Sequence, residues 1–364
     1  MKQFWKTYGR RHLWLAALLL FALFFHGIKH SVSAMEWVTS QITTPIKNGL
    51  SFLCSYVSFS VAELCWVVAI AWVVIHVGGT FWGLAKQPRK GFFLYGRLLT
   101  LCCAVGTVYV LFCWLWSANY YTSGVAEKLG IETGPISVEQ LADTTRYVAQ
   151  QLNESSKYVS RNSEGYFQGS KREILLASSS IYENIQAQYP VLAAPARQVK
   201  EFQPGVIMSY LNLTGFFFPF TGEANVNTDC PLALVPSTIA HEIAHQRGVA
   251  PEQEANFVAV LACTTSQNPV YEYSGWLMAY IHLSNALYSA DPDQYAQIRD
   301  SLEQGVRQDL SYNSLYWSAF STPVAKASTS INDAFLKSNG QQQGVKSYGV
   351  VADLLVAYYQ DALN

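Results

Sequence analysis

The segment STIAHEIAHQRGVAPEQEANFVAVLA, residues 237–262, contains two histidines and three glutamates among apolar residues. Helix stop and start signals divide this segment into two helices. Gly248 is a typical residue at the end of a helix, and Pro251 is a typical first residue of the next one. His241 and His245 then lie four residues apart on the first helix, on the same face and about one turn from each other. The stretch therefore predicts two short helices joined by a tight turn.

The spacing of the two histidines suits a single metal ion. The segment His241-Glu242-Ile243-Ala244-His245 has the pattern HExxH, in which the histidines are zinc ligands and Glu242 lies beside the ion as the base that accepts a proton from water. The neighbouring residues are apolar, and two buried imidazoles without partners are costly. Core histidines bonded to the backbone are the structural alternative. We expect His241 and His245 as ligands and Glu242 as the catalytic residue.

A catalytic zinc ion takes a third protein ligand and keeps one position open. The metzincin class is excluded because Pro251 stands where its third histidine would be. At about 100° per residue, Glu252 and Asn256 share a helix face, whereas Glu254 points away. We expect Glu252 as the third ligand of one Zn²⁺ per chain and Asn256 as a group that orients a ligand. Glu254 is the alternative ligand, or a carboxylate that favours the helix dipole.

Further site residues are expected on both sides of this stretch. Glu223, Asn225 and Asn227 precede the first helix and are candidates for a substrate cleft along an edge strand, although Asn and Gly in such a segment also serve turns. His282 and Tyr348 are candidate oxyanion donors.

Three apolar runs, about 13–28, 59–79 and 98–116, are close to the roughly 20 residues that cross a lipid bilayer. Lysines and arginines precede the first run and fill the loop between the second and third, which predicts a cytoplasmic N-terminus. The loop 29–60 and residues 117–364 then face outward. The expected organisation is a membrane domain, 1–116, with three transmembrane helices, followed by an extracytoplasmic domain, 117–364. A cleavable signal peptide ending at Ala34 is the alternative for the first run.

The amino-acid composition indicates which classes of binding partner to expect. Half of the residues are hydrophobic and only 13% are charged, which favours a lipid bilayer as a partner, and the formal net charge of −1 predicts no binding to nucleic acid. Cys230 and Cys263 fall in the outward part, where they could form a disulfide or remain buried thiols.

The outward part reads as a mainly helical α+β domain with a short sheet. Ser137 and Gln140 form a capping-box pattern that opens a helix to about Leu152. Helical spacing of apolar residues also predicts helices over 163–189, 293–308, 323–336 and 348–363. Between them, residues 206–238 are rich in aromatic and β-branched residues with Gly and Pro, which predicts one or two short strands.

The letters EQEAN, residues 252–256, resemble the ExEAD element of gluzincin membrane proteases, the HtpX-like and CAAX prenyl protease-like enzymes. In those enzymes the first glutamate of the element is the third zinc ligand, which implies that role for Glu252. The element usually lies much further downstream of HExxH there than it does here.

A second resemblance covers nearly the whole chain. The three spans, ANYYTSGVAEKLG, GFFFPFTGEANVNTDCPLALVPSTIAHEIAHQRGVAPEQEANF, YSGWLMA and NDAFLKSNGQQQGVKSYGVVADLL resemble an uncharacterised bacterial membrane family, the domain of unknown function thirty-eight ten. That resemblance implies a zincin-like, metal-dependent peptidase domain anchored in the bacterial cytoplasmic membrane, with no substrate established.

Two functions are expected from these observations. The first is a membrane-anchored zinc metallopeptidase of gluzincin type that hydrolyses membrane-proximal or cell-envelope polypeptides. The alternative is a catalytically silent scaffold or receptor with the zincin fold. Glu242 favours the enzyme, because a silent relative usually lacks the base or a ligand.

Overall fold

The structure is a computed structural model, and it describes residues 2–339, 341 and 348–363. The chain divides into two compact units. Unit 1 contains residues 1–50, 61–122 and 219–221, and unit 2 contains residues 51–60, 123–218 and 222–364. The segment 51–60 precedes the second apolar run in the sequence, yet it belongs to unit 2 with the later residues.

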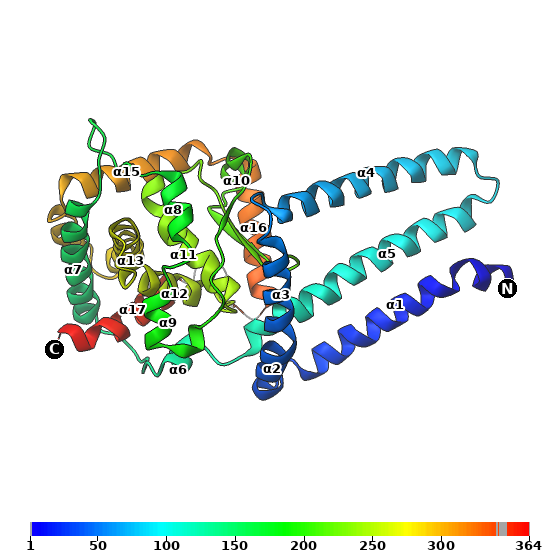
Figure 1. Cartoon of the computed structure of the whole chain (residues 1–364), viewed down its shortest axis with the longest axis horizontal. Coiled ribbons are helices and arrows are strands. Elements are labelled where there is room, and N and C mark those ends of the chain that lie inside the picture. The colour runs from blue at the N-terminus through cyan, green and yellow to red at the C-terminus, as the bar shows by residue number, and fades with distance from the viewer. Residues whose placement is uncertain (1, 340, 342–347, 364) are drawn as a thin grey trace. The chain divides into compact units, whose positions relative to one another are not determined.

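Unit 1 contains three helices that are long and apolar enough to cross a membrane, α1 (Lys2–Ile28), α4 (Val61–Lys86) and α5 (Lys90–Leu115). In Figure 1, α5 lies between α1 and α4 and packs against both. Their large apolar side chains are mostly exposed, which supports a membrane protein. Each helix extends beyond the predicted apolar run on one side, into residues 2–12, 80–86 and 90–97 respectively. Shorter elements are α2 (Val32–Val38), η1 (Thr39–Thr43), α3 (Thr44–Cys54) and η2 (Ser117–Tyr121).

Unit 2 is mostly helical, as the sequence predicts. Its helices are α6 (Val125–Leu129), α7 (Val138–Ser155), η3 (Ser156–Tyr158), α8 (Lys171–Ala177), α9 (Glu183–Gln188), η4 (Pro190–Leu192), α10 (Gly205–Tyr210), η5 (Leu232–Leu234), α11 (Val235–Gln246), α12 (Glu252–Thr264), α13 (Pro269–Ala290), α14 (Pro292–Asp300), α15 (Gln304–Ala319), α16 (Pro323–Ser338) and α17 (Tyr348–Leu363).

The core of unit 2 is built around α12. This helix is apolar on every side from Phe257 to Cys263, and all seven of these positions are fully buried, as expected for a helix surrounded by others. It packs against α11 and α13, and α13 packs in turn against α7 and α17. Cys230 and Cys263 are free, buried thiols, so they do not form a disulfide.

A three-stranded sheet with the order β1-β3-β2 accompanies the helices. β1 (Lys200–Glu201) pairs parallel with β3 (Glu223–Val226), and β2 (Gly215–Phe218) pairs antiparallel with β3, Gly215 opposite Val226. Both β2 and β3 pack against α11. The one or two strands expected between residues 206 and 238 are present as β2 and β3, and β1 is an additional strand.

Local signals explain most helix limits. The capping box that opens α7 is complete, since the Ser137 hydroxyl accepts from Gln140 N at 3.1 Å and the Gln140 side chain accepts from Ser137 N at 2.8 Å. The helix expected over 293–308 is instead two helices, α14 and α15. Asn153 of α7 causes this break, because its amide binds Ser301 O at 2.9 Å and Glu303 N at 2.8 Å.

The helix expected over 163–189 is also divided, into α8 and α9. A β-bridge between Arg161 and Phe167 precedes α8. After α8, the hydroxyls of Ser178, Ser179 and Ser180 each bond back to a carbonyl three residues earlier. Such bonds compete with helical hydrogen bonding, which accounts for the end of α8.

Candidate metal centre

The turn between α11 and α12 has the geometry of a Schellman motif. Gly248 has φ +94°, a conformation that favours glycine. Its N–H donates to His245 O at 2.9 Å, and the N–H of Val249 donates to Ala244 O at 3.1 Å. The chain reverses here, so that α12 begins only six residues after the last turn of α11 and Glu252 comes to lie beside the histidines.

The structure brings the three predicted ligands together. One ligand atom each from His241, His245 and Glu252 all lie within 4.8 Å of one another. Glu252 Oε2 is 3.2 Å from His241 Nε2 and 3.7 Å from His245 Nε2. Two imidazole nitrogens and a carboxylate oxygen thus converge on one point between α11 and α12.

A backbone carbonyl fixes the orientation of His245. Its Nδ1 lies 2.7 Å from Val249 O, and because a carbonyl only accepts, Nδ1 carries a proton and Nε2 faces Glu252. Burial lowers the pKa of His245, but the charge of Glu252 and its hydrogen bond outweigh burial and raise that pKa to about 9. Burial raises the pKa of Glu252, yet the neighbouring histidines hold it far below its usual range. His245 and Glu252 thus stabilise each other's charged forms.

Glu242 lies beside this group and is almost completely buried, with 3% of its surface exposed. Among the described residues its Oε2 has no hydrogen-bond partner. Burial raises its pKa to about 7, against the charges of His241 and His245. Gly215 of β2 approaches it so closely that an added Cβ would lie 2.6 Å from Glu242 Oε1. The carboxylate is thus held between α11 and the backbone of β2.

Neighbouring elements hold α11 in place. The buried Tyr182 hydroxyl donates to Ala240 O at 2.7 Å, one residue before His241. The guanidinium of Arg247, at the end of α11, lies 4.1 Å from the centre of the Tyr182 ring. The orientation of the histidines therefore depends on a side chain some sixty residues earlier in the chain, which sequence reasoning did not identify.

Glu254 and Asn256 do not join the group. Glu254 is turned toward the start of α6, where the backbone N–H of Val125 binds it, and burial raises its pKa. Asn256 is half-buried on α12, and no hydrogen bond joins its amide to the three grouped residues in the part of the chain that the structure describes. Of the two carboxylates considered, Glu252 is the one beside the histidines.

Glu223, Asn225 and Asn227 lie inside unit 2 and have internal partners. Glu223 pairs with Lys200 at 3.2 Å, Asn225 accepts from Ser60 Oγ at 2.6 Å, and Asn227 donates to Ser209 Oγ at 2.8 Å. β3 is moreover the central strand, paired on both sides. The three side chains expected to line a substrate cleft are thus bonded within unit 2, and at Asn225 and Val226 the strand is paired on both sides.

His282, on α13, is buried near the group. Burial lowers its pKa to about 4, and the charge of His241 acts in the same direction, so this imidazole is neutral at neutral pH. Tyr348 is the first residue of α17, but its side chain lies outside the described residues. His282 thus remains a candidate oxyanion donor, and Tyr348 is not tested.

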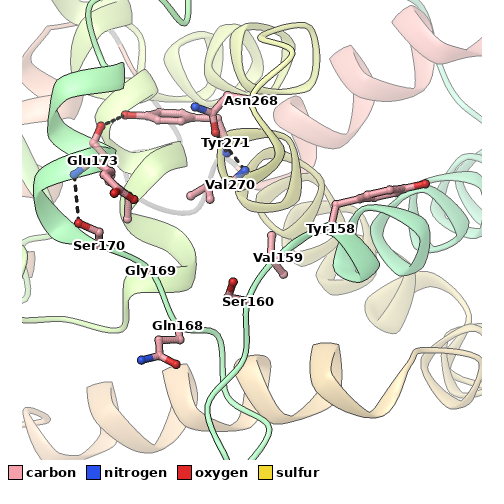
Figure 2. Close-up of a pocket in the computed structure, with 11 residues that line it drawn as sticks. Tyr158, Val159, Ser160, Gln168, Gly169, Ser170, Glu173, Asn268, Val270 and Tyr271 are labelled. Atoms are coloured by element: carbon pink, nitrogen blue, oxygen red, sulfur yellow. Dashed lines mark hydrogen bonds between the residues drawn. The ribbon is translucent and has the colours of Figure 1, made fainter.

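A separate cavity of about 600 Å³ contains none of these residues. Figure 2 shows it between the chain around Ser160 and Gln168 and the start of α13. Two of its polar groups are bound internally, since Ser170 Oγ accepts from Glu173 N and the Tyr271 hydroxyl donates to Ile174 O. The cavity is not a part of the candidate metal centre.

Comparison with known proteins identifies the family of this chain. The model of the family described as "Protein of unknown function (DUF3810)" matches residues 39–356. The chain belongs to the DUF3810 family. No curated protein and no solved structure matches the chain significantly. The part matched to DUF3810 includes α11, α12 and the whole candidate metal centre.

Proposed function

We propose that this DUF3810 chain is a membrane-anchored zinc metallopeptidase of the gluzincin type, with a zincin-like unit 2. The observation that carries the proposal is the convergence of His241, His245 and Glu252, whose ligand atoms lie within 4.8 Å of one another. Its substrates would be membrane-proximal or cell-envelope polypeptides.

The donor set fits a catalytic zinc ion. Two histidines and one glutamate form a known three-ligand set that leaves a fourth position open. The buried Glu242 Oε2, which has no hydrogen-bond partner in the part of the chain that the structure describes, lies next to that set, as required of a group that acts on something bound there. When bound, zinc supplies Lewis-acid activation of a carbonyl and of water.

Residues of the chain would supply proton transfer, stabilisation of the oxyanion and orientation of the ligands. Glu242 takes the proton of the attacking water and returns it to the leaving amine, which keeps the proton balance of peptide hydrolysis. His282 donates a hydrogen bond to the developing negative charge on the carbonyl oxygen. Val249 holds His245 through its carbonyl, so that Nε2 is directed at the open centre.

The orientation of the protein is part of the proposal. Lys2, Lys6, Arg10 and Arg11 lie in the first turns of α1, before its apolar run, and Lys86, Arg89 and Lys90 surround the short connection from α4 to α5. This distribution supports a cytoplasmic N-terminus and an extracytoplasmic unit 2 in the bacterial cytoplasmic membrane.

The test uses the full chain purified in detergent, as wild type, His245→Ala and Glu242→Gln. Zinc is measured by elemental analysis after dialysis, and cleavage is followed with a library of internally quenched peptides. We expect one zinc per chain in wild type and Glu242→Gln, none in His245→Ala, and cleavage by wild type only. Wild-type protein without stoichiometric metal would overturn the proposal. Bound zinc with no cleaved peptide would replace it by the silent scaffold.

A further inference from the structure

The 51–60 segment, Ser51–Ser60, comprises the last turn of α3 and the connection to α4, and it has two different faces. One face binds unit 2 through backbone carbonyls and hydroxyls, and the other exposes large apolar side chains. We propose that this segment is a lipid-contacting anchor that holds unit 2, and α11 in particular, at the outer surface of the membrane.

Lys200 of β1 binds the inner face. Its side chain is only 9% exposed, and its ammonium group donates to Cys54 O at 2.8 Å, to Phe59 O at 2.9 Å and to Val57 O. An ammonium has three N–H donors, so these carbonyls satisfy all of them. Glu223 Oε1, 3.2 Å away, supplies the counter-charge. A buried cation of this kind is retained only with such partners.

Two side-chain bonds complete the attachment. Ser60 Oγ donates to Asn225 Oδ1 at 2.6 Å on β3. Gln246 Nε2 donates to Ser51 Oγ at 3.3 Å and to Gly222 O at 2.8 Å. Gln246 directly follows His245 in α11, so the segment is bonded to the helix that carries the proposed ligands.

The outer face is apolar. Phe52, Leu53, Tyr56 and Phe59 are all exposed, Tyr56 by 74%, and the rings of Phe52 and Tyr56 contact each other with centroids 5.2 Å apart. Four large apolar side chains exposed within ten residues form a patch of the kind that marks an interaction surface. Three of the four are aromatic, and the amphipathic ring of Tyr56 in particular favours the zone where a membrane meets water.

Chain continuity identifies the lipid as the occupant. α4 begins at Val61, the residue after Ser60, with no linker between them. At 1.5 Å per residue α4 is about 39 Å long, close to the roughly 40–45 Å of a whole bilayer. Val61 therefore lies in the headgroup region, and Phe59, two residues earlier, is at most about 7 Å from it along the chain. The exposed side chains are thus at the depth where lipid is the neighbour.

Holding unit 2 at the membrane surface would restrict which peptide bonds the metal centre can reach. This conclusion rests on the proposed function. Because Gln246 couples α11 to the 51–60 segment, the metal centre is kept at a set height above the lipid. Peptide bonds close to the membrane surface, such as those in the segments that flank a transmembrane helix, are then the ones within reach.

The test is photo-cross-linking of the full chain in vesicles of phosphatidylethanolamine and phosphatidylglycerol. Benzoylphenylalanine replaces Tyr56 or Phe59, and the control is the same replacement at Tyr158. Tyr158 has a similar exposure, 68%, but lies on η3, which packs against α7 and α13. We expect lipid adducts by mass spectrometry at positions 56 and 59, at least tenfold more than at 158.

Adducts to protein in place of lipid at positions 56 and 59, or equal lipid adducts at all three positions, would overturn the inference. Zinc content and peptide cleavage are measured on the same samples, so the two proposals are separable. Lipid adducts without bound zinc leave the anchor standing and reject the peptidase, whereas bound zinc and cleavage without lipid adducts reject the anchor alone.

Discussion

Gly215 of β2 lies against the carboxylate of Glu242 with no space for a side chain, since a Cβ at position 215 would be 2.6 Å from Oε1 and 2.7 Å from Cγ. We expect Gly215→Ala to displace Glu242 while leaving the three proposed ligands in place. A displacement of about 1 Å lowers catalysis by up to about a hundredfold. The expected result is a ten- to hundredfold lower kcat/KM on a cleaved peptide, with the zinc content unchanged.

Gly134→Ala is the control for that variant, because nothing lies within 4 Å of a Cβ at position 134. It should match the wild type in both measurements. Unchanged cleavage by Gly215→Ala would show that the position of Glu242 is not critical, and would argue against its role as the base.

Gly248 and Gly130 both have positive φ, +94° and +70°, and both lie at the C-terminal end of a helix, α11 and α6 respectively. Alanine should cost about 1 kcal/mol of stability at either position. Only Gly248→Ala should also weaken zinc binding, by about tenfold, because it disturbs the Val249 carbonyl that orients His245. Competition with a fluorescent chelator measures the affinity, and equal affinities in the two variants would contradict this account of the turn.

The carboxylates of α12 offer a paired test of the ligand set. Glu252→Gln should lose zinc on dialysis, because it removes the charged oxygen that lies 3.2 Å from His241 Nε2. Glu254→Gln should keep it, since Glu254 binds the Val125 N–H instead. Elemental analysis of both proteins decides the matter, and loss of zinc from Glu254→Gln alone would reassign the third ligand.

A buried network should determine much of the stability of unit 2. Asp309 accepts from Arg161 Nη1 at 2.9 Å, from the Tyr273 hydroxyl at 2.5 Å and from Phe167 N at 2.8 Å. Asp309→Asn leaves the Arg161 charge without its partner and should cost about 3 kcal/mol in a urea titration. Asp143→Asn breaks an exposed pair with Arg146 and should cost less than about 1 kcal/mol; equal costs would contradict the assigned role of the network.

The convergence of His241, His245 and Glu252 was predictable from sequence because its geometry is local. His241 and His245 are four residues apart, and residues at that spacing always share a helix face. Gly248 and Pro251 indicate the turn and the start of α12. The angle between neighbouring residues on α12 then separates Glu252 from Glu254. The same locality made α7 predictable, since its capping box involves only Ser137 and Gln140.

Features that depend on distant partners were missed. Nothing near Gly215 in the sequence indicates that Glu242 will pack on it, and nothing near Tyr182 indicates a bond to α11. Asn225 was predicted to face a cleft because it precedes α11, but β1, formed some 25 residues earlier, pairs with β3 and encloses it. The division of residues 293–308 likewise depends on Asn153, a residue of α7.

The three proposed ligands all come from residues 241–252, joined by a turn that needs only its own glycine. Closing so short a loop costs little chain entropy, and contacts this local form early in folding. A chain growing from the ribosome therefore has all three proposed ligands available as soon as α12 has emerged, while α13 to α17 are still to be synthesised. On the proposed function, the later helices would fold around a ligand group that is already complete.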